Sequence, residues 1–128
     1  MNKILVDSDV LIGILRNNER ALELLNTLAK ESLVSCSALT AFEVQLGVRK
    51  GEEERTNQLL RTLIVIPLGE DEANLAGKLI RENRWKGLTV DFVDAGIAAT
   101  CLLHGYELLT LNVRHFRPLG VPLLLTED

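Results

Sequence analysis

Three acidic side chains, Asp7, Glu43 and Asp94, are the residues of this chain best suited to chemistry, although they lie far apart in the sequence. Asp7 directly follows the apolar run of residues 4–6, which is typical of a buried parallel strand, and an apolar pattern at helical spacing begins at Val10. A residue between a strand and the following helix lies at the carboxyl edge of an α/β sheet, where such folds bind ligands. Asp7 is therefore the first candidate for a functional side chain.

The other candidates fall at comparable places in the sequence pattern. Glu43 lies within a helix for which Ser37 is the predicted N-cap, and apolar residues flank it, so we expect its side chain to be partly buried. Asp94 lies one helical turn after Asp91, which opens another helix. The segment 110–112 follows a further predicted strand, so it is also expected at the functional edge.

The pattern of apolar residues predicts the elements that must bring these side chains together. Short apolar strands alternate with amphipathic helices along the whole chain, which is typical of a parallel sheet covered by helices. The predicted strands are 3–6, 33–36, 64–67 and 107–110, with a further edge strand over 121–125. The predicted helices begin near residues 10, 21, 38, 52, 70 and 91. We therefore expect residues 1–128 to form one domain, a three-layer α/β/α sandwich with a mostly parallel sheet of four to five strands.

Two of these helices carry candidate residues, and their apolar faces are expected to pack into the core. For the helix after Ser37 these faces comprise Leu39, Phe42, Leu46 and Val48, and for the helix after Asp91 they comprise Ile97, Ala98, Cys101 and Leu102. His104 is expected to contact the last carbonyl groups of the second helix. His115 is expected to be structural, with contact to the substrate or to the acidic ligands as the less favoured alternative.

In a parallel sheet the carboxyl ends of all strands share one edge, and the helices that leave this edge point their first turns toward it. Asp7, Glu43 and Asp94 are therefore expected in one cleft. Carboxylates gathered in this way repel one another unless a cation lies between them. Mg²⁺ is the expected cation, with Mn²⁺ as the alternative, because both are hard ions that bind carboxylate, water and phosphate oxygens.

The composition is typical of a soluble globular protein. Because only 4% of the residues are aromatic, we expect aliphatic side chains to form the core. Cys36 and Cys101 lie in apolar segments and are expected to be small core residues, with a disulfide as the less favoured alternative. We find no signal peptide and no membrane-spanning run, and expect a cytoplasmic location. The net charge of −4 argues against nucleic-acid binding by bulk charge alone. It leaves open an enzyme that approaches nucleic acid through bound divalent cations.

Four segments, in this order, resemble a PIN-domain ribonuclease of the VapC toxin type: residues 6–11 (VDSDVL), 40–47 (TAFEVQLG), 94–100 (DAGIAAT) and 109–116 (LTLNVRHF). The resemblance covers nearly the whole chain and implies a PIN-like fold. It further implies a Mg²⁺-dependent endoribonuclease that acts on RNA, forms a homodimer and is neutralised by a VapB-type antitoxin protein.

The resemblance assigns the metal-binding acids to Asp7, Glu43 and Asp94. The fourth family position, often aspartate, is Asn112 here, which brings hydrogen-bonding groups but no charge, so the number of metals is left open. Asp91 is a weaker metal-ligand candidate that would compensate for the missing charge.

The mechanism expected from these residues is hydrolysis of an RNA phosphodiester by metal-activated water. A cation held by Asp7 and Asp94 would lower the pKa of bound water, and Glu43 would complete the coordination or orient the nucleophile. Thr110 and Asn112 would position the water or the phosphate. Two basic residues, Arg114 and Arg117, are candidates for holding the flanking phosphates.

Two other functions fit part of the pattern. In a haloacid-dehalogenase-like phosphatase, Asp7 would be the nucleophile, Asp9 the acid/base and Lys86 the late lysine, but Glu43 would then have no function. In a catalytically weak PIN-like binding module, Asn112 would mark a site with too few acids to cleave RNA.

Each candidate also has a purely structural interpretation. Asp7 could be a turn residue, Asp91 an N-cap and Asp94 a first-turn acid. The pattern Thr40-x-x-Glu43 fits a capping box.

Overall fold

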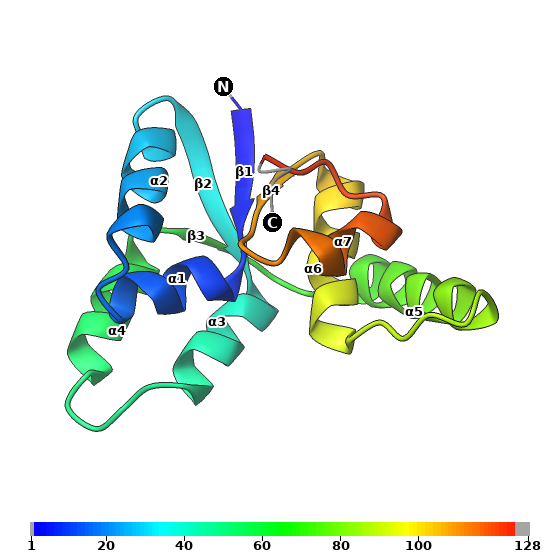
Figure 1. Cartoon of the computed structure of the whole chain (residues 1–128), viewed down its shortest axis with the longest axis horizontal. Helices are drawn as coiled ribbons and strands as arrows, with labels where there is room; N and C mark the ends of the chain where they lie inside the picture. The colour runs from blue at the N-terminus through cyan, green and yellow to red at the C-terminus, as the bar shows by residue number, and fades with distance from the viewer. Residues whose placement is uncertain (1, 125–128) are drawn as a thin grey trace.

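A parallel sheet forms the middle layer of the protein, whose computed structural model describes residues 2–124 (Figure 1). Within these residues the sheet has four strands: β1 (Asn2–Val6), β2 (Ser32–Ser37), β3 (Ile64–Ile66) and β4 (Glu107–Leu109). Their order is β3-β2-β1-β4, and every adjacent pair is parallel. The chain therefore moves outward from β1 to β3 and then crosses back to place β4 beside β1. This reversal opens a ligand-binding crevice at the carboxyl ends of β1 and β4.

Helices cover both faces of the sheet, as the predicted three-layer sandwich requires (Figure 1). One face carries α1 (Ser8–Leu15), α2 (Glu19–Ala29) and α4 (Glu53–Arg61), and the other carries α5 (Glu70–Trp85), α6 (Phe92–His104) and α7 (Val113–Phe116). Two further elements are α3 (Ala38–Leu46), which follows β2, and a 3₁₀ turn, η1 (Arg117–Leu119). In β1, Ile4 and Val6 belong to the hydrophobic core on one face of the sheet, whereas Leu5 belongs to the core on the other face.

The strand predicted over 121–125 is reduced to a single bridge between Leu108 and Leu123, and Leu125 lies outside the described residues. The Leu108 N–H donates to the Pro122 carbonyl oxygen at 2.8 Å, and the Leu124 N–H donates to the Leu108 carbonyl oxygen at 3.0 Å. Pro122 has no N–H to extend this ladder, so pairing is short. The described sheet thus has the smaller of the two predicted strand numbers.

The predicted apolar face of α3 is wrong at Phe42 and Leu46, which are 59% and 75% exposed. Leu39 is partly buried, and the buried residues of the helix are Thr40 and Val44. Helix α3 stands at the carboxyl end of the sheet and contacts α1 and α6 with one side, so Phe42 and Leu46 face outward. Leu102 of α6 is likewise 40% exposed and not part of the core.

Three smaller predictions have different outcomes. Cys36 and Cys101 are free, buried thiols, as predicted, and burial raises their pKa values to about 11 and about 12. His104 does not contact the last carbonyls of α6 with its ring; its Nε2 lies 2.9 Å from Glu72 Oε1 and links α6 to α5. No helix in the described part of the chain is both long and apolar enough to cross a membrane.

Helix α6 approaches α3 closely at Gly96. A Cβ atom added there would lie 2.3 Å from the Leu39 Cδ1 atom, whereas one added at Gly77 on α5 would meet nothing within 4 Å. We predict that Gly96→Val lowers the free energy of unfolding by about 1–3 kcal/mol relative to Gly77→Val, because the valine must displace Leu39.

Urea unfolding followed by circular dichroism measures this difference. Both variants place the same residue in the middle of a long helix, so helix propensity cancels. Equal midpoints for the two variants would show that the close approach of α3 and α6 is not a packing constraint.

Candidate active site

Asp7 lies at the point where β1 gives way to α1, beside the end of β4. Its side chain is 3% exposed and caps α1. Asp7 Oδ1 accepts a hydrogen bond from the Ser8 N–H at 2.8 Å, and Oδ2 accepts one from the Thr110 hydroxyl at 2.8 Å. The carboxylate is therefore oriented by the first residue of α1 and by the residue that follows β4. The structure places Asp7 and Thr110 together, as the sequence predicts.

A second carboxylate, Asp9, shares this position. Asp9 Oδ2 accepts the Leu111 N–H at 3.0 Å and lies 3.3 Å from the Thr110 hydroxyl oxygen. Its other oxygen, Oδ1, is buried and has no hydrogen-bond partner among the described residues. The Asn112 N–H donates to the same Thr110 oxygen at 3.0 Å, so Thr110 fixes the loop against both acids. Asp9 thus leaves one oxygen available to a ligand.

Glu43 reaches the same region from α3 and is partly buried, as predicted. The Ser8 hydroxyl donates to Glu43 Oε1 at 2.7 Å, which connects α3 to the start of α1. The capping-box interpretation is wrong, because α3 begins at Ala38 after the N-cap Ser37, whose hydroxyl accepts the Leu39 N–H at 3.1 Å. The Glu43 side chain therefore does not cap α3 and instead contacts Ser8 beside Asp7.

Asp94 lies in the first turn of α6. Its Oδ2 is 3.6 Å from Nδ1 of His115, which belongs to α7. Asp91 is the N-cap of α6, and its Oδ2 accepts the N–H groups of Val93 and Asp94 at 3.1 and 3.2 Å. The structural interpretation of Asp91 is thus correct, although its charge still lies beside Asp94.

The carboxylates raise one another's pKa values. Burial raises the pKa of Asp7 to about 7, helped by the charge of Asp9 and, more weakly, of Asp94, and opposed by the hydrogen bonds from Thr110 and Ser8. Burial also raises the pKa of Asp94 to about 6, with contributions from the charges of Asp91, Glu43 and Asp9, and His115 opposes this shift. The pKa of Asp9 is also raised, chiefly by burial. The acids therefore act on one another as a group.

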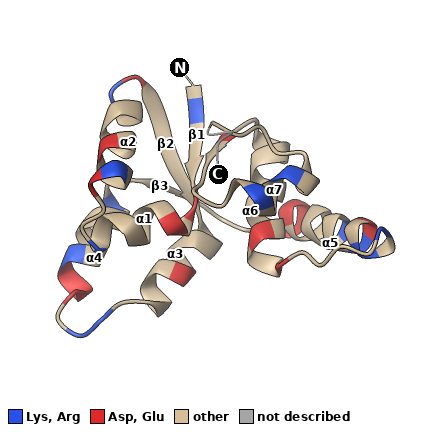
Figure 2. Ribbon diagram, in the orientation of Figure 1, with Lys and Arg blue, Asp and Glu red and all other residues tan. Residues whose placement is uncertain are grey.

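A hollow of about 660 Å³, here called the acidic hollow, is lined by some of the acids of the site, whereas Asp7 and Asp9 are not in its lining. Its lining includes Glu43, Asp91, Asp94, Arg114 and His115. Figure 2 shows acidic residues of α1, α3 and α6 around the carboxyl end of the sheet, with basic residues of α7 close to α6. The site thus combines anionic side chains with neighbouring cationic ones.

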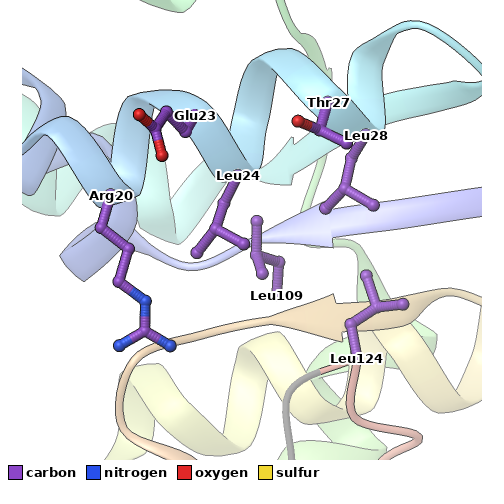
Figure 3. A pocket seen from close by; sticks show the side chains of 7 residues that line it. All are labelled: Arg20, Glu23, Leu24, Thr27, Leu28, Leu109 and Leu124. Carbon is purple, nitrogen blue, oxygen red and sulfur yellow. The ribbon is translucent and has the colours of Figure 1, made fainter.

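Another hollow, of about 310 Å³, has a different character (Figure 3). Leu24 and Leu28 of α2 face Leu109 and Leu124 across it, and Arg20 lies at one end. None of the predicted site residues lines it. Its lining is mainly apolar and includes a single carboxylate, that of Glu23, so it does not gather several acids as the other site does.

The donor set at the crevice fits a hard divalent cation. No group of three His, Cys, Asp or Glu side chains in residues 2–124 is already arranged as a metal cluster. However, Mg²⁺ and Mn²⁺ commonly use only one or two carboxylates and complete their shells with water and substrate. A positive charge would give the unpartnered buried Asp9 Oδ1 a partner and would lower the raised pKa values of Asp7 and Asp94.

Sequence reasoning missed two residues of this site. From the sequence, Asp9 is assigned a role only as the acid/base of a phosphatase, and Ser8 is assigned none. The signal was present in the Asp7-Ser8-Asp9 triplet, because a helix start presents its first residues toward the same edge as its N-cap. His115 faces Asp94 and lines the acidic hollow, which agrees with the less favoured of its two interpretations.

The comparisons with known proteins agree in their result. The family model described as "PIN domain" matches residues 4–120. The chain is 34% identical to Ribonuclease VapC19 of Mycobacterium tuberculosis over 88% of this chain and 90% of that protein. It is 36% identical to Ribonuclease VapC10 of the same species, over 88% and 85% of the two chains.

Solved structures are similar over the same extent. A toxin–antitoxin complex from Klebsiella pneumoniae contains a chain with a TM-score of 0.79 and 30% identity, covering 94% of this chain and 93% of that one. FitAcB from Neisseria gonorrhoeae gives a TM-score of 0.81 and 28% identity, with 94% and 95% covered.

The raised pKa of Asp7 predicts how the stability of the metal-free protein depends on pH. The carboxyl titrates near 3.8 when unfolded and near 7 when folded, so between these values only the folded state holds the proton. The free energy of unfolding should therefore fall as the pH rises from about 4 to about 7. Asp7→Asn should flatten this dependence and be about 1–3 kcal/mol more stable than the wild type at about pH 8.

Thermal or urea unfolding in EDTA across this pH range provides the measurement. Asp71→Asn, at an exposed acid in α5, is the matched control and should leave the wild-type profile unchanged. An Asp7→Asn profile as steep as that of the wild type would disprove the raised pKa.

Proposed function

The chain belongs to the PIN-domain family of VapC-type ribonucleases, and we propose that it is a metal-dependent endoribonuclease that hydrolyses RNA phosphodiester bonds at the Asp7 crevice. The observation that carries this proposal is the meeting of distant acids at one edge of the sheet. Asp7 comes from β1, Glu43 from α3 and Asp94 from α6, and each affects or contacts another member of the group.

We assign the cation to Asp7 and Asp94, with Glu43 acting directly or through water and Asp91 as a weaker ligand. Mg²⁺ is the proposed ion and Mn²⁺ the alternative. When bound, such a cation lowers the pKa of its water and neutralises charge that develops on a phosphoryl group.

The protein's own side chains prepare this chemistry. Thr110 donates to Asp7 Oδ2 and favours its ionised, ligand-competent form. Ser8 holds Glu43 Oε1 toward the crevice, where the glutamate can orient a nucleophilic water. Asn112 follows Thr110 and supplies an amide that can hold a water or a phosphate oxygen without adding charge.

The basic residues close to this site support binding of a polyanion. Arg114 lines the acidic hollow, and Arg117 follows on the same short helical segment. We propose that they hold the phosphates that flank the cleaved bond. Such local contacts offset the overall charge of −4.

We also propose a VapB-type antitoxin as the protein partner, a homodimer as the assembly and the cytoplasm as the location. The similarity to chains from toxin–antitoxin complexes supports the partner. Large apolar side chains on the described surface support association, because Phe42, Leu46, Trp85 and Phe92 are each more than half exposed.

The two other functions are disfavoured for different reasons. Membership of the PIN-domain family argues against the phosphatase, and Glu43 contacts Ser8 beside Asp7 where a phosphatase would leave it idle. The catalytically weak binding module differs from the proposed enzyme only in turnover, so an activity measurement separates them.

Cleavage of total cellular RNA is the direct test. We predict divalent-dependent cleavage by the wild type, and a loss of at least about 100-fold for Asp7→Asn and for Asp94→Asn, because each substitution removes a charge that holds the cation. Gel electrophoresis with Mg²⁺ or Mn²⁺, and with EDTA, measures the rates.

Asp71→Asn is again the control and should cleave like the wild type, since Asp71 is exposed on α5. Circular dichroism should show all three variants folded. Cleavage that persists in EDTA would contradict metal dependence, and a folded wild type without any cleavage would favour the binding module.

A further inference from the structure

Part of the lining of the acidic hollow is not used by the proposed hydrolysis. Besides its charged residues, the lining includes Leu88, Thr89 and Val90, from the segment between α5 and α6, together with Pro118. These are three apolar side chains and one hydroxyl. Hydrolysis of a phosphodiester needs charge and water, so an apolar wall beside the acids calls for another explanation.

A second hollow, of about 420 Å³, adjoins the first and is lined by residues 111–115. Arg114 and His115 line both hollows, so their side chains stand between the two. His115 Nδ1 also lies 3.6 Å from Asp94 Oδ2. The positive charge of Arg114 therefore lies at the boundary between the two hollows, next to His115, which contacts the proposed metal ligand Asp94.

This arrangement restricts where a nucleic-acid strand can lie. A phosphate is attracted to the positive charge of Arg114 and repelled by the carboxylates of Glu43, Asp91 and Asp94. With the phosphate on this boundary, the adjoining nucleotides extend into the two hollows. A volume of about 660 Å³ falls within the range of small-molecule sites, and apolar side chains that stand beside polar ones in one hollow can hold the flat face of a base.

We propose that the wall formed by Leu88, Thr89, Val90 and Pro118 is a subsite for the base of one nucleotide adjoining the cleaved phosphodiester. The proposal rests on the ribonuclease function proposed above and adds a determinant of sequence preference to it. A base in a duplex is stacked and paired and cannot enter, so the substrate at this subsite is single-stranded RNA. The Thr89 hydroxyl can donate to or accept from the base edge.

Substitutions at Leu88 test the subsite, because this side chain is 45% exposed and can change without disturbing the core. Leu88→Ala enlarges the subsite and Leu88→Trp fills it. We expect the purine-to-pyrimidine ratio at one position next to the cut to change in opposite directions in the two variants, by about threefold or more from the wild type. Sequencing the cut ends of a random single-stranded RNA pool measures this ratio.

Leu103→Ala and Leu103→Trp are the matched controls, since Leu103 is 44% exposed near the other end of α6. They should keep the wild-type preference, and all four variants should unfold at similar urea concentrations. Active Leu88 variants with an unchanged preference, or a change spread over many positions, would overturn the subsite and leave the ribonuclease function standing. A wild type that cuts no RNA would overturn both.

Discussion

Burying carboxylates beside one another costs free energy, and the rest of this site is organised around that cost. Asp7 is almost inaccessible, Asp9 is nearby, and Asp94 and Glu43 approach from two other helices. Burial and like charge together raise the pKa of Asp7 to about 7 and that of Asp94 to about 6. A protein that needed only a stable fold would have no use for this arrangement, whereas a divalent cation converts the repulsion into attraction.

The fold produces this concentration of charge through its topology. The reversal of strand order between β1 and β4 opens the crevice, and α1 and α6 each begin there with an aspartate as the N-cap. Thr110 then joins the end of β4 to Asp7, which fixes the acid before any ligand arrives. The close packing of α6 on α3 at Gly96 brings Asp94 and Glu43 to the same hollow. Packing in the core therefore controls the geometry of the site.

Much of this arrangement could be predicted from the sequence, because it depends on local patterns. Parallel strands with a shared edge are predicted by three features of the sequence: the apolar run before Asp7, the caps Ser37 and Asp91, and the alternation of strands and helices. The exposure of Phe42 and Leu46 on α3 could not be predicted, because a row of apolar residues at helical spacing does not indicate whether it packs in the core or lies on the surface. The contact of His104 with Glu72 depends on how α5 lies against α6. The participation of Asp9 and Ser8 in the site could not be predicted, because it depends on their contacts with Thr110 and Glu43, which are distant in the sequence.

A divalent cation bound among these acids should be visible by anomalous X-ray diffraction from crystals soaked in Mn²⁺. We expect an anomalous difference peak between the carboxylates of Asp7 and Asp94, absent in crystals of Asp7→Asn treated identically. A wild-type crystal with no peak there, or with manganese only at other acids, would show that these carboxylates do not form a cation site.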